Sequence, residues 1–278
     1  MRVSCFILAF LIAGTPALAQ KPSDAPAVQS APVGKPPPQA KTQQEFNDYQ
    51  ADQALSGGQA AEKAADDFAV KYPQSELREY LYSWAMREYQ HENNPGKILV
   101  MGEKVLALDP DNTIALVLSA TVLADILNDA EPDREQKIAK INEYSKNALQ
   151  TLDIGFAAPP GATPDQVQAY KNTLQSLVHS ALGITELKTR DFAGAEKDLL
   201  FAADVDKTGN DPYIWYHLAL AQDRLATSLT NEDQKQEKYL QALASVNRAL
   251  QYAGSNTDLV ALVQAERARL ERITGVLN

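Results

Sequence analysis

The chain of 278 residues is poor in the side chains that build cross-links and metal sites: it has one cysteine, Cys5, and three histidines. A single thiol cannot form an intrachain disulfide, and it cannot provide a zinc site with several cysteine ligands. Aromatic residues make up only 7% of the chain, and alanine and leucine dominate its apolar residues. Because alanine and leucine are strong helix formers, this composition favours helices over sheets.

Positive charge is also scarce, with 26 Lys and Arg residues against 36 Asp and Glu residues and a formal net charge of −10. An acidic protein repels the phosphates of a nucleic acid, so we expect no nucleic-acid partner. The one conspicuous apolar run, residues 6–13, is too short to cross a bilayer as a helix. We therefore expect no membrane span in the mature protein.

Residues 1–19 have the three parts of a secretory signal peptide. Arg2 is the basic start, residues 6–13 form the apolar region, and Ala17-Leu18-Ala19 is a small-x-small cleavage site. Cleavage after Ala19 predicts a cysteine-free mature protein, without disulfides, in the bacterial periplasm or outside the cell. An uncleaved anchor or a buried helix is the alternative interpretation of this segment.

Residues 20–44 hold six of the fifteen prolines, mixed with Ala, Gln, Lys and Ser. Such a segment buries too little apolar surface to offset its ordering entropy, which predicts a disordered Pro/Ala-rich spacer. A proline-rich recognition motif is the alternative. Residues 45–278 differ, because apolar residues recur there at helical spacing and prolines are sparse. We predict an all-α domain over this range.

The predicted helices come in pairs with similar packing positions. In one unit these positions are Tyr82, Ala85, Met86, Tyr89, Ile98, Gly102 and Val105, before Pro110. Later units contain Leu182-Gly183, Ala195, Leu199 and Ala202, and then Asp211-Pro212, Trp215, Leu218 and Ala219. Small residues at such positions let two helices approach closely, and large residues fill the remaining space.

This pattern resembles the tetratricopeptide repeat (TPR), a helix–turn–helix of about 34 residues. The resemblance implies a right-handed α-α superhelix, a TPR-like solenoid, of about five helix pairs and a C-terminal capping helix. Gly102 departs from the motif, because a large residue is expected at its position. Residues 128–137 and 228–238 are read as insertions that lengthen helices or loops. The segments 57–58 and 155–164 are read as breaks in the stack.

Residues 256–276 are predicted to form the capping helix. Its apolar residues are expected to face inward, and these are Leu259, Leu262, Val263, Leu270, Ile273 and Leu277. Its charged residues are expected to face outward, and these are Arg267, Arg269, Glu271 and Arg272. A polar outer face is typical of the last helix of a repeat protein.

The TPR resemblance also implies a binding surface, because the first helix of each pair lines the concave face of the superhelix. The residues placed there are Tyr80, Arg87, Ile114, Val117, Ile184, Leu187, Tyr213, Tyr216 and Leu220, with Asp223 at the end of the last row. Tyrosine, arginine and aliphatic side chains suit a protein or peptide partner. The alternative is that long inserted helices or the capping helix cover this face.

No motif for nucleotide binding or for a nucleophile elbow occurs, so we expect neither a cofactor nor enzyme activity. His91 is read as a helix C-terminal residue, His179 as a core residue and His217 as a neighbour of Trp215; a His179–His217 metal pair is the alternative. Three acidic pairs, Asp66-Asp67, Asp109-Asp111 and Glu131-Asp133, are read as helix-surface and turn residues.

The expected function is that of an exported, non-catalytic scaffold that binds protein or peptide in the bacterial cell envelope. A second hypothesis is an assembly factor for the outer membrane or peptidoglycan. It comes from Ala64, Phe68, Tyr72, Pro73 and Ser75, whose spacing resembles a repeat variant of envelope proteins such as outer-membrane assembly lipoproteins. An enzyme without a recognisable motif is the third.

Overall fold

The computed structural model of the chain describes residues 38–155, 162–205 and 210–276. The predicted signal peptide and most of the predicted spacer lie outside these residues. The chain divides into two compact units, which are described separately. The first comprises Met1–Ile126 and Ala139–Leu174, and the second comprises Leu127–Ile138 and Gln175–Asn278.

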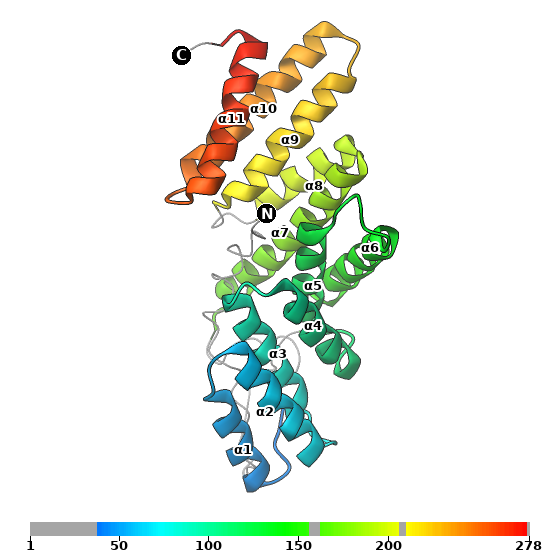
Figure 1. Cartoon of the computed structure of the whole chain (residues 1–278), viewed down its shortest axis with the longest axis vertical. Helices are drawn as coiled ribbons and strands as arrows, with labels where there is room; N and C mark the ends of the chain where they lie inside the picture. The colour runs from blue at the N-terminus through cyan, green and yellow to red at the C-terminus, as the bar shows by residue number, and fades with distance from the viewer. Residues whose placement is uncertain (1–37, 156–161, 206–209, 277–278) are drawn as a thin grey trace. The chain divides into compact units, whose positions relative to one another are not determined.

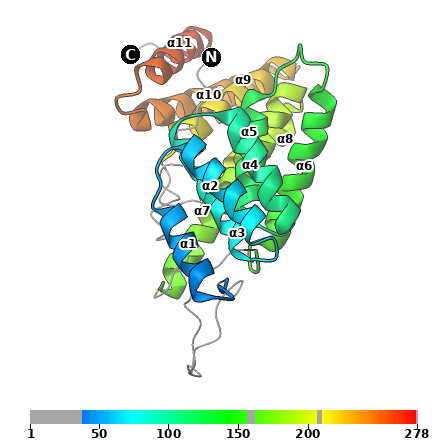
Figure 2. The same cartoon turned by 60° about the horizontal axis from the view of Figure 1, so that its bottom comes forward.

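The described residues form eleven helices and no strand. Figure 1 shows the order of the helices along the chain. They are α1 (Gln43–Gln53), α2 (Gly58–Lys71), α3 (Leu77–His91), α4 (Pro95–Leu108), α5 (Thr113–Ile126), α6 (Arg134–Thr151), α7 (Pro164–Thr189), α8 (Phe192–Val205), α9 (Pro212–Ser228), α10 (Glu232–Tyr252) and α11 (Thr257–Thr274). Each helix packs against the next one along the chain from α1 to α5 and from α8 to α11 (Figure 1, Figure 2). The prediction of an all-α fold with consecutively packed helices is confirmed.

The helix starts follow the local sequence closely. Pro95, Pro164 and Pro212 are the first residues of α4, α7 and α9, where the missing N–H of proline costs no helical hydrogen bond. The Asn94 side chain caps α4 by accepting a hydrogen bond from the backbone N–H of Lys97 at 3.2 Å. Side-chain caps of this kind satisfy unpaired N–H groups of the first turn, so α4 begins at a defined residue.

The first unit buries the packing positions that the repeat pattern predicted, including Tyr82, Met86 and Ile98. At Gly102 the structure explains why this chain lacks the large residue that the repeat motif expects. A Cβ atom at Gly102 would lie 2.5 Å from the Ser119 hydroxyl oxygen and 3.1 Å from the Met86 methyl group. Helix α5 therefore approaches α4 too closely for any side chain at this position.

The second unit buries Ala195, Leu199, Leu218 and Ala219, again as predicted. Gly183 on α7 faces α8, and a Cβ atom there would lie 2.6 Å from Leu199 Cγ. Close contact at a small residue is the physical reason for the Leu-Gly pair in the pattern.

Helix α11 forms where the capping helix was predicted, but part of its predicted orientation is wrong. Leu259, Val263 and Leu270 are buried as expected, and Leu277 lies outside the described residues. Leu262 and Ile273 are 54% and 41% exposed, so they face outward rather than inward. A regular helix can turn only one side toward α10, and that side is defined by the 259–263–270 row.

The two predicted insertions correspond to long elements. Helix α10 has 21 residues and α6 has 18, compared with 14 in α4 and α8. Helix α7 is longer still, with 26 residues. None of the described helices combines the length and apolar character that a membrane-spanning helix needs.

Candidate functional site

The predicted binding residues of the first unit lie on α3 and α5. Tyr80 and Arg87 are seven residues apart, two turns along one side of α3, and both are half-buried. On α5, Ile114 is half-buried, whereas Val117 is fully buried. Val117 therefore packs inside the unit, and Tyr80, Arg87 and Ile114 are the members of this set that reach the surface.

Arg87 has no hydrogen bond or ion pair among the described residues. Burial lowers the pKa of Arg87, and the titratable neighbours that act on its guanidinium within the described residues are the phenols of Tyr170 on α7 and Tyr49 on α1. Leaving a desolvated cation without an acceptor is costly, and other buried cations in proteins are normally paired. Arg87 thus differs from a purely structural arginine.

The tyrosines near Arg87 cannot neutralise it. Burial raises the pKa of Tyr170 to about 12, and burial also raises the pKa of Tyr49 and of Tyr80 above the ordinary value. All three phenols are therefore neutral at physiological pH. A guanidinium offers five donors in a planar fork that matches a carboxylate. The Arg87 guanidinium can therefore bind an anionic group from outside the chain.

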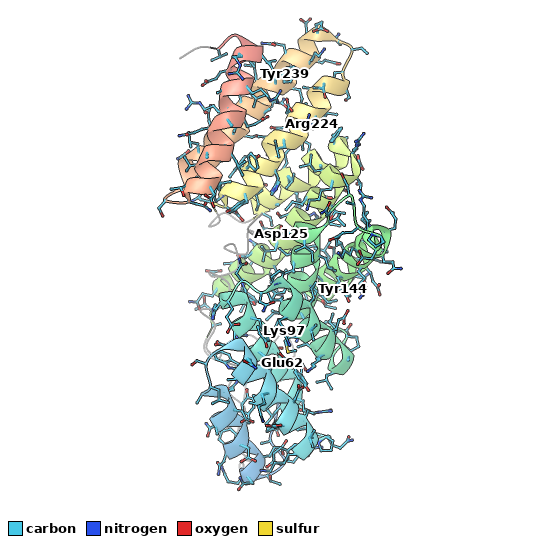
Figure 3. The ribbon with its side chains drawn as sticks, viewed as in Figure 1. Glu62, Lys97, Asp125, Tyr144, Arg224 and Tyr239 are labelled. Atoms are coloured by element: carbon cyan, nitrogen blue, oxygen red, sulfur yellow. The ribbon has the colours of Figure 1, made fainter. Side chains whose placement is uncertain are left out.

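The carboxylates of α2 have their own partners. Glu62 accepts hydrogen bonds from Lys97 at 2.8 Å and from the Tyr89 hydroxyl (Figure 3). Asp66 accepts hydrogen bonds from the Tyr82 hydroxyl at 2.8 Å and from Lys104 Nζ at 2.7 Å. Burial opposes ionisation of Glu62, but the hydrogen bonds from Lys97 and Tyr89 outweigh it and lower the pKa of the carboxyl group. Both carboxylates therefore serve to join neighbouring helices.

The predicted row on α9 in the second unit is partly covered by α11. The Tyr213 hydroxyl accepts a hydrogen bond from the Asn256 amide at 2.7 Å, just before α11 begins. Asp223 is 1% exposed and forms an ion pair with Arg269 of α11. The prediction that Arg269 faces outward is therefore wrong. The alternative, in which the capping helix covers the face, therefore holds for Asp223 and for the hydroxyl of Tyr213.

The other predicted residues of the second unit have different degrees of exposure. Ile184 is buried, and Leu187 packs against the cluster formed by α8 and α9. Tyr216 and Leu220 remain half-buried. Burial and the nearby charge of Glu266 raise the pKa of Tyr216, so its phenol is neutral. The half-buried members of this set, which a partner can reach, are Leu187, Tyr213, Tyr216 and Leu220.

A cluster of titratable residues joins α7 to α8. His179 Nδ1 lies 2.9 Å from Asp198 Oδ1, and the His179 ring lies 4.1 Å from the Phe201 ring, centroid to centroid. Burial raises the pKa of Glu186 to about 7, and the charge and hydrogen bond of Asp198 act in the same direction. Glu186 is therefore partly protonated at neutral pH. His179 was predicted to be a core residue, and it is half-buried, with its ring against Asp198 and Phe201.

The two other histidines differ in exposure. His91 is the last residue of α3, as predicted, and its ring is exposed, 3.7 Å from Glu88 Oε1. Burial lowers the pKa of His217 to about 4, so His217 is neutral. Within the described part of the chain, no three His, Cys, Asp or Glu side chains gather in a way that could hold a metal ion.

Sequence reasoning placed Arg87 on the binding face but missed its tyrosine neighbours and the Glu186–Asp198 pair. Tyr49 and Tyr170 are 38 and 83 residues from Arg87 in sequence, so no local pattern connects them. Glu186 follows His179 by seven residues, two helical turns, and this spacing was a usable signal.

Comparison with known proteins adds no relative to this description. No family model matches the chain, no curated protein is significantly similar to it, and no solved structure matches its fold.

Proposed function

We propose that this protein is an exported, non-catalytic scaffold of the TPR type that binds a protein or peptide partner in the bacterial cell envelope. The proposal includes a cleaved signal peptide, a periplasmic or secreted location and a superhelix of about five helix pairs. Support comes from the consecutively packed helices and from the small residues, such as Gly183, at the close helix contacts. Repeat folds of this kind generally serve as binding surfaces.

The observation that carries the proposal is the state of Arg87. Its guanidinium is half-buried, has no acceptor among the described residues, and belongs to the α3 row that the repeat pattern assigns to the binding face. The chain contains 36 acidic residues, yet none of the described ones pairs with Arg87. A partner that supplies a carboxylate would compensate this charge, and Tyr80 and Ile114 would contact its apolar part.

The test compares Arg87→Met with Arg224→Met. Arg224 is an exposed arginine on α9 and provides a matched change of charge (Figure 3). Each variant is used to capture partners from the native cell envelope, and the bound proteins are identified by mass spectrometry. We expect the wild type and Arg224→Met to retain one common partner, which Arg87→Met loses.

A melting experiment separates binding from folding. Because Arg87 has no acceptor in residues 38–155, 162–205 and 210–276, its replacement by methionine should remove a desolvation cost, and the free protein should melt at the same or a higher temperature. A clearly lower melting temperature would mean that Arg87 is structural. Retention of the partner by Arg87→Met would refute its role in binding.

A further inference from the structure

The outward face of α11 is apolar in its middle and charged at its ends. One stripe of its exposed residues consists of Asp258, Ala261, Leu262, Ala265, Ala268 and Arg272, and it is flanked by the exposed Thr257 and Gln264 on one side and Ile273 on the other. The opposite side of α11 is fixed in the core of the second unit by Leu259 and Val263. Figure 1 shows α11 at the edge of the group that it forms with α9 and α10. This face therefore has no cover from its own unit.

The charges of α11 divide into two groups. Arg267 pairs with Glu271 at 2.8 Å, and Arg269 pairs with Glu266 at 2.8 Å and with Asp223. Asp258 and Arg272 are the remaining acid and base of this helix, and neither has an ion pair among the described residues. Fourteen residues separate them, which is about 21 Å along a helix, so they cannot pair with each other within one chain.

These positions are symmetric about Ala265. When two copies of α11 lie antiparallel with Ala265 facing Ala265, residue 258 of one copy faces residue 272 of the other. Asp258 then meets Arg272 at both ends of the contact, and Leu262 of each copy meets Ala268 of its partner. A twofold interface requires this kind of self-complementarity, in which the same patch supplies both halves. The three alanines allow the helix backbones to approach closely.

We propose that the exposed face of α11, from Asp258 to Arg272, is a homodimerisation surface at which two copies pair antiparallel about a twofold axis through Ala265. The apolar centre supplies the attraction, because Leu262 loses its contact with water. The two ion pairs set the direction and register of the helices, because a parallel arrangement would place like charges together. The charges and the apolar residues of this face complement those of a second copy, and this self-complementarity favours a homodimer over binding of a different protein.

The test is a charge exchange followed by sedimentation velocity, from low micromolar to several hundred micromolar protein. We expect the wild type to show a reversible monomer–dimer equilibrium. Asp258→Arg and Arg272→Asp each place two like-charged pairs in the interface, and each should weaken dimerisation by about tenfold or more. The variant with both substitutions has the same pairs with exchanged signs and should dimerise like the wild type.

A mixing experiment makes the test specific for the antiparallel register. Asp258→Arg and Arg272→Asp are each weak as homodimers, but an equimolar mixture has two opposite-charge pairs and should form a heterodimer. Leu262→Asp should abolish dimerisation, and circular dichroism melts of all variants verify that they are folded. A wild type that remains monomeric throughout the series overturns the proposal. Equal dimerisation of the single and double variants, or no heterodimer in the mixture, also overturns it.

Discussion

Replacement of Arg269 by methionine tests how α11 is held to α9. The substitution keeps the apolar stem of the side chain and removes its charge. It leaves Asp223, which is 1% exposed, without its ion-pair partner. Breaking a buried ion pair from one side costs about 3–5 kcal/mol. The Arg269 side chain is 36% exposed, so solvent screening reduces the expected loss of unfolding free energy to about 2 kcal/mol.

Two further variants isolate the pair from other effects. Arg267→Met removes a neighbouring arginine of the same helix, whose acceptor Glu271 is 21% exposed compared with 2% for the Asp223 side chain, and it should cost less than about 0.5 kcal/mol. Asp223→Asn removes the buried charge itself. In the Asp223→Asn background, Arg269→Met should therefore cost much less than in the wild type. The double-mutant cycle is expected to give a coupling free energy of about 2 kcal/mol.

Chemical unfolding with tryptophan fluorescence measures these differences in the second unit. The chain has two tryptophans, and Trp215 packs against the core cluster that includes α11 residues, whereas Trp84 belongs to the first unit. A Trp84→Phe background therefore confines the signal to the second unit. If Arg269→Met destabilises this unit no more than Arg267→Met does, the ion pair with Asp223 does not hold α11 in place, and the reasoning is refuted.

Two further predictions concern packing and pH. Gly102→Leu restores the large residue of the repeat pattern. It should destabilise the first unit by about 1–3 kcal/mol, because the Cβ atom of the new side chain would overlap Ser119. The control is Gly96→Ala, which lies in open surroundings on the same helix. Calorimetry of both variants decides this. The pKa of Glu186, raised to about 7 by burial and Asp198, makes the folded state bind a proton that the unfolded state has released. The shift from 4.5 to about 7 corresponds to about 3 kcal/mol. Solvent screening of this half-buried group reduces the effect, so stability should fall by about 1 kcal/mol as pH rises from 4.5 to 7, a dependence that Glu186→Gln removes.

The repeat pattern predicted the close helix contacts well, because it consists of small and large residues at fixed positions. Ala195, Leu199 and Ala202 are fully buried at the positions expected from their spacing. Helix boundaries were equally accessible, since proline and capping residues act within one turn. The exception, Gly102, was visible in the sequence as a departure, but only the position of Ser119 on α5 explains it.

The binding face was predicted less completely. The pattern places Tyr80 and Arg87 on one side of α3, but it does not reveal that Tyr49 and Tyr170 surround the guanidinium. Val117 was assigned to the same face, but it is buried. Helix α5 is apolar on all sides, so its sequence does not show which side faces the core.

By itself, the sequence determined that the chain is helical, where most helices begin, and which small residues lie at helix contacts. These properties depend on the backbone and on neighbours within one or two turns. Only the tertiary structure decided which side of α11 is outward, that Arg269 reaches the buried Asp223, and that none of the described side chains pairs with Arg87. Such facts depend on side chains that meet from distant parts of the chain, and hydrophobic spacing within one helix does not specify what the next helix brings to it.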